Sequence, residues 1–197
     1  MKKETKKQLL IGAALVLELL FLLLYLNGRI DRLLDSDMSS EMILGQLLAR
    51  NNGILSDQWY YSTELRVLNT QLIYALFFRL SSNWHFVRMA STLVLWCVLI
   101  ASYGVLCRVM GCKKSFGVTA LLLAAPVSES YFRFVLAGVY YVPHLAIAFA
   151  ALALNEAYFK AKPDRKKFWL VVSVLLALVA GLGGPREIIE DHFDRSP

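Results

Sequence analysis

Long apolar runs separated by short polar stretches dominate this chain. The first run, Leu9 to Leu26, is rich in leucine and follows a lysine-rich start. It is longer than the ~7–15 apolar residues of a signal peptide, and it continues into "NGRIDR" without a small-residue cleavage site. The pattern therefore predicts an uncleaved transmembrane helix over 9–26 behind a basic segment, 1–8.

Residues 27–85 are polar to amphipathic and contain no lysine. One helix is predicted from Ser40 to Asn51, with Asn52-Gly53 as its stop signal. A second is predicted from Thr63 to Leu80, with Ser62 as its N-cap. Neither has an apolar run long enough to cross a bilayer, so both are expected to lie on the membrane surface.

The second half of the chain, 86–184, predicts four further spans. The first covers Val87 to Val109, with Arg88 reaching toward the membrane surface at its outer end. The 45 residues between the lysines at 113–114 and those at 160–167 fit a hairpin of two spans that turns near 134–142. Phe168 to Gly184 is the fifth predicted span.

Composition and charge support this layout. The chain is 57% hydrophobic with a mean hydropathy of +0.52, which is too apolar for a typical soluble domain. Every lysine lies in one of three clusters, at 2–7, 113–114 and 160–167, as in cytoplasmic loops of membrane proteins. We therefore expect an all-α, multi-pass protein of the cell membrane with five spans, a cytoplasmic N-terminus and an external segment 27–85. A basic surface for nucleic acid is not expected, because the charge follows no single polar face.

Acidic residues gather directly after the first span, at Asp35, Asp37 and Glu41. This arrangement, followed by surface helices and paired spans, resembles the N-terminal part of GT-C-type membrane glycosyltransferases, the superfamily of protein O-mannosyltransferases and lipid A aminoarabinose transferases. Three segments carry the rest of the resemblance: "NWHFVRMASTLVLWCVLIASYGVLCRVMG", "LLAAPVSESYFRFVL" and "FWLVVSVLLALVAGLGG". The resemblance as a whole covers nearly the whole chain, but only the first third to half of such an enzyme.

The charged stretch "PREIIEDHFDRSP", 185–197, departs from this pattern. Pro185 stands where the family continues with a Gly-Leu-x-x-Lys-Gly motif. This stretch is either an acidic tail outside the membrane or an artificial end, in which case the chain is a truncated family member.

The resemblance implies transfer of a sugar from a polyprenyl-phosphate donor to an extracytoplasmic acceptor. Such a reaction needs a general base for the acceptor hydroxyl and cations for the leaving phosphate. Asp35 or Asp37 would be the base, and Glu41 would orient the acceptor or help to bind a divalent cation, the one cofactor considered. The expected substrate-binding residues are Glu41, Trp59, Tyr60, Tyr61, Glu64, Arg66, Arg88, Arg133 and His144. The expected partners are the lipid bilayer, the donor, the acceptor and, as an open alternative, another membrane protein.

Simpler roles stand beside these. "DSDMSS" is also a good helix N-terminal signal, and the aromatics at 59–61 also suit an interfacial belt. His85 and His144 suit structural hydrogen bonds, and Glu129 and Arg133 have the spacing of an i,i+4 ion pair. At the level of the whole chain, the alternatives are a non-catalytic membrane scaffold or subunit and a transporter component that uses Glu18 and Glu129 as intramembrane acids.

Overall fold

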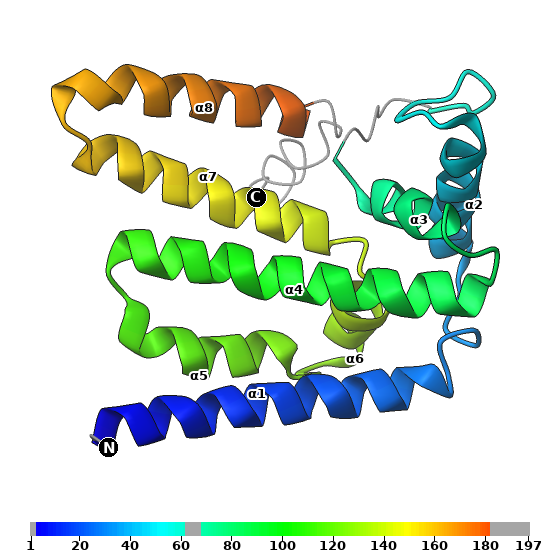
Figure 1. The fold of residues 1–197 in the computed structure, drawn as a ribbon, viewed down its shortest axis with the longest axis horizontal. Coiled ribbons are helices and arrows are strands. Elements are labelled where there is room, and N and C mark those ends of the chain that lie inside the picture. Colours follow the sequence, from blue (N-terminus) through cyan, green and yellow to red (C-terminus); the bar gives the residue numbers. More distant parts are fainter. Residues whose placement is uncertain (1–2, 62–67, 182–197) are drawn as a thin grey trace, which may run out of the picture.

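Three helices are long and apolar enough to cross a membrane in the part of the chain that the structure describes. The structure is a computed structural model that describes residues 3–61 and 68–181, all of whose regular elements are helical. The three are α1 (Lys3–Asn27), α4 (Trp84–Met110) and α7 (Val142–Lys160). They run along a common direction (Figure 1). The fold class is therefore confirmed as an all-α protein with candidate membrane spans, which indicates a multi-pass membrane protein.

A fourth passage exists only as a bent pair of helical segments. α5 (Lys113–Ala124) is followed by a break and then by α6 (Glu129–Tyr131) and the π-helix η1 (Phe132–Ala137), and the two halves meet at 89°. Pro126 lies in the break, and the Ser128 hydroxyl restarts the helix by accepting a hydrogen bond from the Tyr131 N–H at 3.1 Å. The first half of the predicted hairpin is therefore not one continuous helix, because proline removes a helical donor. The turn predicted near 134–142 includes the link between η1 and α7.

The last described helix, α8 (Pro163–Gly181), has 19 residues but is not among the candidate spans. Charged residues occupy its first turn, and its uncharged part runs only from Phe168 to Gly181. That part is roughly 21 Å long at the helical rise per residue, against ~30 Å for a bilayer core. The rest of the predicted span, 182–184, and the stretch 185–197 lie outside the described residues.

The segment between α1 and α4 contains α2 (Ser36–Asn51) and α3 (Thr70–Phe78). α2 ends where predicted, with Asn52 in the left-handed region at φ 49°. It begins four residues earlier than predicted because Asp35 is its N-cap. A helix is confirmed within the predicted range 63–80, but α3 begins at Thr70 and not at Thr63. Its described start is capped by Asn69, whose side chain accepts from the Thr70 N–H at 2.7 Å. The predicted cap, Ser62, lies outside the described residues.

α2 and α3 pack closely because Gly45 has no side chain. A Cβ atom on Gly45 would lie 2.6 Å from the Cβ of Tyr74 and 3.1 Å from the Gln71 carbonyl oxygen. In Figure 1, α2 runs across the direction of the long helices at one end of the molecule. This orientation agrees with a surface helix, whose place on a membrane stays a prediction.

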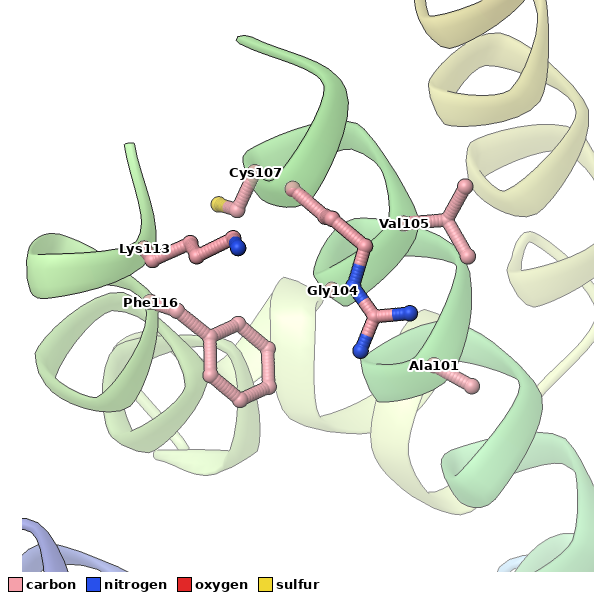
Figure 2. A pocket seen from close by; sticks show the side chains of 7 residues that line it. Ala101, Gly104, Val105, Cys107, Lys113 and Phe116 are labelled. Carbon is pink, nitrogen blue, oxygen red and sulfur yellow. The ribbon is translucent and has the colours of Figure 1, made fainter. Parts of the chain in front are cut away.

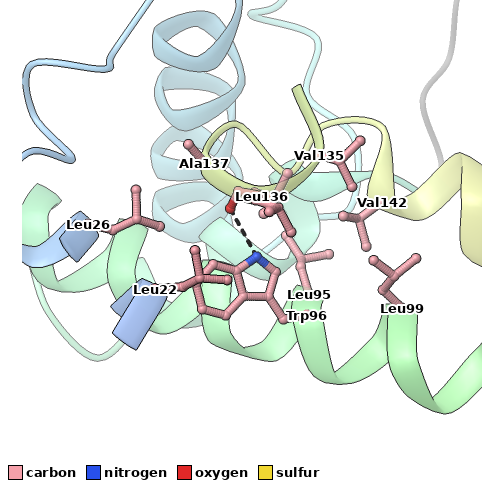
Figure 3. Packing of buried hydrophobic residues seen from close by; sticks show 10 residues of the cluster. Leu22, Leu26, Leu95, Trp96, Leu99, Val135, Leu136, Ala137 and Val142 are labelled. Atoms are coloured by element: carbon pink, nitrogen blue, oxygen red, sulfur yellow. Dashed lines mark hydrogen bonds between the residues drawn. The ribbon is translucent and has the colours of Figure 1, made fainter. Parts of the chain in front are cut away.

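The main hydrophobic cluster joins α1, α4 and η1 (Figure 3). Trp96 is 1% exposed, and its indole N–H donates to the Leu136 carbonyl at 2.9 Å. Leu22 and Leu26 of α1 belong to the same cluster. A π-helical turn leaves backbone groups in poorer geometry than an α-helix, so this side-chain donor helps to hold η1 in place.

The two ends of the helix array have different chemistry. The start of α1, the α4–α5 connection and the α7–α8 connection lie at the same end (Figure 1), and they contain the three lysine clusters. The acids after α1 lie at the opposite end (Figure 1). The predicted grouping of lysines is therefore confirmed, and the side of the membrane each end faces stays a prediction.

Candidate functional site

Asp35 and Asp37 stand at the start of α2 and have different surroundings. Asp35 is half-buried, and its Oδ1 accepts a hydrogen bond from the Met38 N–H at 2.9 Å. This is the N-cap role that the sequence offered as the simpler interpretation. Asp37 is exposed in the first helical turn and has no side-chain partner among the described residues. Its carboxylate is therefore the one that is open to a ligand.

Tyr140, in the link between η1 and α7, is electrostatically coupled to both acids. The pKa of Tyr140 is raised to about 12, first by burial and then by Asp35, Tyr141 and Asp37, while Arg133 opposes the shift. The interaction between two charges weakens with distance. The fold thus brings the start of α2 and the η1–α7 link within electrostatic range of each other, although they are far apart in the sequence.

The backbone at this link is strained. Val139 is fully buried and has φ 56°, an uncommon conformation for a β-branched residue. The preceding Gly138 N–H donates to the Arg133 carbonyl at 2.8 Å, which closes the wide π-type turn. Strained residues and π-turns both concentrate at functional sites, and Tyr140 and Tyr141 directly follow this one. The two rings lie 5.1 Å apart.

His144 lies one turn into α7 beside these tyrosines. Its Nδ1 is 3.3 Å from the Tyr140 carbonyl oxygen, and its ring is 6.1 Å from that of Tyr141. His85 is 3.0 Å from the Asp31 carboxylate and 3.2 Å from the Asn27 side-chain oxygen. The structural hydrogen bonds expected for both histidines are therefore confirmed.

Glu41 is buried between α2 and α3, where it accepts a hydrogen bond from the Thr70 hydroxyl. Its side chain points into the protein one turn after Asp37. This position favours a role in packing α2 against α3 over a role in binding the acceptor. Thr70 is fully buried as well, so the pair satisfies two polar groups that would otherwise be costly to bury.

Arg88 is 2% exposed, and the prediction that it reaches toward the membrane surface was wrong. Its guanidinium donates to the carbonyl oxygen of Ile30, to that of Leu33 at 3.3 Å and to the sulfur of Met38. The two carbonyl groups lie in the connection between α1 and α2, outside the helical hydrogen-bond pattern, and so offer acceptors. Arg88 therefore supports the site by fixing the chain that leads to Asp35.

A buried polar layer lies next to Arg88, and the sequence interpretation missed it. Ser91 and Thr92 of α4 and Tyr74 of α3 are fully buried, and their hydroxyl oxygens have no hydrogen-bond partner in the described structure. Burial raises the pKa of Tyr74, with Glu41 adding to the effect. The signal was present in "RMAST", where polar residues at i, i+3 and i+4 share one helix face.

The aromatic residues at 59–61 lie away from the acids. Trp59 and Tyr61 pack against the cluster formed by Leu44, Leu48 and Ala75, two to three turns along α2. The Tyr61 hydroxyl accepts from the Ser56 N–H at 2.9 Å, whereas Tyr60 is 89% exposed. The structure does not bring this group to Asp37, and Glu64 and Arg66 lie outside the described residues.

Arg133 is exposed at the same end as the acids. The ion pair predicted between Arg133 and Glu129 is absent, because the chain changes from α6 to the wider η1 after Tyr131 and the i,i+4 spacing no longer places the two side chains together. Arg133 is thus open to an anion. Among the described residues, no three His, Cys, Asp or Glu side chains form a group that could hold a metal ion.

Comparison with known proteins gives no family for this chain. No family model, curated protein or solved structure matches it. The resemblance to GT-C-type glycosyltransferases therefore stays a prediction that depends on the sequence segments quoted above.

Proposed function

We propose that this chain is, or forms the N-terminal part of, a polytopic membrane glycosyltransferase that uses a polyprenyl-phosphate-linked sugar. The observation that carries the proposal is the position of Asp35 and Asp37 at the end opposite the lysine clusters, within electrostatic range of Tyr140. In this proposal the lysine-rich end is cytoplasmic, α8 contributes to a fifth span, and the acids face an extracytoplasmic acceptor.

The proposed reaction is a displacement at the anomeric carbon of the donor sugar. The acceptor hydroxyl oxygen forms a bond to that carbon while its proton passes to a carboxylate. The bond between the carbon and the phosphate oxygen breaks, and its electron pair leaves with the lipid phosphate. A positioned cation lowers the cost of that developing charge.

The geometry assigns different roles to the nearby residues. Asp37 is the general base, because its carboxylate is exposed and has no partner in the described structure. Asp35 positions it by starting α2. Arg133 is the phosphate contact, since it is exposed at the same end, whereas Arg88 is committed to backbone carbonyls.

The test is release of polyprenyl phosphate by membranes that contain the chain and a radiolabelled polyprenyl-phosphate sugar. Asp37→Asn should lower the rate at least 100-fold, the smaller end of a general base's contribution. Asp57→Asn is the matched control, because Asp57 is an exposed acid in the same segment. It should leave the rate unchanged.

Equal rates for Asp37→Asn and the parent chain would contradict the role of Asp37. If the parent chain releases no phosphate, labelling by a photoreactive polyprenyl-phosphate sugar tests the donor site directly. Labelling that Arg133→Gln abolishes would support a donor-binding N-terminal part, and absence of labelling would exclude one.

A further inference from the structure

An apolar groove and a basic pocket adjoin at the lysine-rich end. The groove has a volume of about 450 Å³ and is lined by apolar residues, almost all from α4, α7 and α8. The pocket has a volume of about 430 Å³ and is lined by residues at the α7–α8 connection, with Lys160, Lys162 and Arg165 as its cations. Ala157 and Trp169 line both cavities. The groove and the basic pocket are therefore adjacent.

The length of the groove along α8 matches the thickness of the apolar part of one membrane leaflet. It follows α8 from Trp169 to Val179, which is roughly 15 Å at the helical rise per residue. This is half of the ~30 Å hydrocarbon core of a bilayer. Trp169 lies at the junction with the basic pocket, and tryptophan is enriched where the apolar core meets the polar headgroups.

Two cations in the pocket are open to an anion. The Lys160 ammonium is occupied, because it lies 2.9 Å from the Glu156 carboxylate and donates to the Val109 carbonyl at 2.8 Å. Lys162 and Arg165 are exposed, and within the described chain their side chains have no hydrogen-bond or ion-pair partner. Asp164 also lines the pocket and partly offsets them, in a first helical turn that favours an acid.

A third cavity extends the basic surface. It has a volume of about 390 Å³ and lies between α4 and α5, where Lys113 and Phe116 face Cys107 and Gly104 (Figure 2). Arg108 lines it as well, and Val105 lines both this cavity and the groove. Cations thus lie in two cavities that each share lining residues with the groove.

We propose that the groove and the basic pocket together bind one anionic glycerophospholipid. Its phosphate contacts Lys162 and Arg165, and one acyl chain lies along α4, α7 and α8. Basic pockets between membrane helices at a lysine-rich surface suit anionic headgroups, and the joined apolar groove selects a lipid over a free anion. This binding does not depend on glycosyl transfer, because it uses the opposite end of the molecule from Asp37.

Native mass spectrometry of the detergent-purified chain tests the proposal with dioleoylphosphatidylglycerol and dioleoylphosphatidylcholine as probes. The anionic lipid should bind more tightly than the zwitterionic one. The double variant Lys162→Gln/Arg165→Gln should weaken binding of the anionic lipid about 30-fold, the factor expected from two basic contacts near a membrane surface. The matched double variant Lys114→Gln/Lys167→Gln removes the same charge from exposed positions that line neither cavity. It should keep the parent affinity.

Two further variants test lipid binding even if the Lys162→Gln/Arg165→Gln variant does not fold. Asp164→Asn should strengthen binding of the anionic lipid, because it removes the one carboxylate in the pocket. Ala157→Leu should weaken binding by narrowing the junction that both cavities share. Equal binding of the two lipids, equal losses in both double variants, or displacement of the lipid by millimolar inorganic phosphate would each overturn the proposal.

Discussion

The guanidinium of Arg88 donates a hydrogen bond to the backbone carbonyl of Ile30, joining α4 to the segment that follows α1. A second bond reaches Leu33 at 3.3 Å, and the same group contacts the sulfur of Met38. The cation is thus held by two backbone carbonyl dipoles and one side-chain sulfur of the segment that leads into α2. The start of α2, and with it Asp35, is therefore positioned by a residue of a different helix.

Replacing Arg88 should destabilise the protein. Arg88→Met keeps much of the side-chain volume but leaves buried carbonyl groups without a donor, which should cost about 2–3 kcal/mol. Arg79→Met is the control, since Arg79 is exposed at the end of α3. Thermal unfolding in detergent, followed by circular dichroism, should show a lower midpoint only for the Arg88 variant. Equal midpoints would mean that the bonds to Ile30 and Leu33 contribute no net stability.

Adding one methyl group at Gly45 should separate α2 from α3. The Cβ of Gly45→Ala would lie 2.6 Å from the Cβ of Tyr74, so the helices must move apart at a cost of about 1–3 kcal/mol. Gly12→Ala provides a control within α1, where a Cβ would meet nothing within 4 Å and alanine favours the helix. The free energy of unfolding should fall for the first variant and stay level or rise for the second.

The carboxylates of Asp35 and Asp37 should account for part of the raised pKa of Tyr140. The pKa of Tyr140 is raised to about 12 by burial first, then by Asp35, Tyr141 and Asp37. Asp35→Asn/Asp37→Asn should lower this pKa without restoring its usual value, because burial remains. The measurement is the difference in tyrosinate absorbance between chains with and without Tyr140→Phe, as pH rises.

The same shift has a defined effect on stability. The native state holds the Tyr140 proton more tightly than the unfolded state, so its stabilising contribution is complete below the unfolded pKa near 10. That contribution is lost as pH rises toward 12. Asp57→Asn should leave the titration unchanged, and a loss of the shift in that control would contradict the proximity of Asp35 and Asp37 to Tyr140.

The buried carboxyl group of Glu18 should make the folded protein less stable than an apolar side chain at the same position would. It lies inside a candidate span, and its Oε2 atom is buried without a hydrogen-bond partner in the described structure. Glu18→Leu should therefore raise the free energy of unfolding by about 1–2 kcal/mol. Gln8→Leu changes an exposed polar residue near the start of the same helix and should have little effect. A lower midpoint for Glu18→Leu would show that the carboxyl group stabilises the folded protein and would contradict this prediction.

Much of the fold could be predicted from local patterns. Apolar runs predicted α1, α4 and α7, because few other structures satisfy the backbone within a membrane. The end of α2 at Asn52 and the capping role of Asp35 follow from short-range hydrogen bonds. Lysine clusters predicted which connections share one end of the molecule.

The rest depended on contacts between distant segments. Nothing near Arg88 in the sequence shows that Ile30 and Leu33 would supply acceptors, so exposure was the simpler expectation. The ion pair between Glu129 and Arg133 assumed a regular α-helix, whereas η1 widens the turn between them. The coupling of Asp37 to Tyr140 likewise requires the fold, because helical periodicity carries no information across the bent passage.

The Arg88 contacts also impose an order on biosynthesis. Ile30, Leu33 and Met38 leave the ribosome well before Arg88, so the start of α2 lacks its holding group until α4 has been made. The segment that contains the acids is therefore made before the residues that surround it in the folded protein. The surroundings of Asp35 and Asp37 are complete only after α4, and then Tyr140, have been synthesised. The start of α2 is therefore made early but reaches its final structure late.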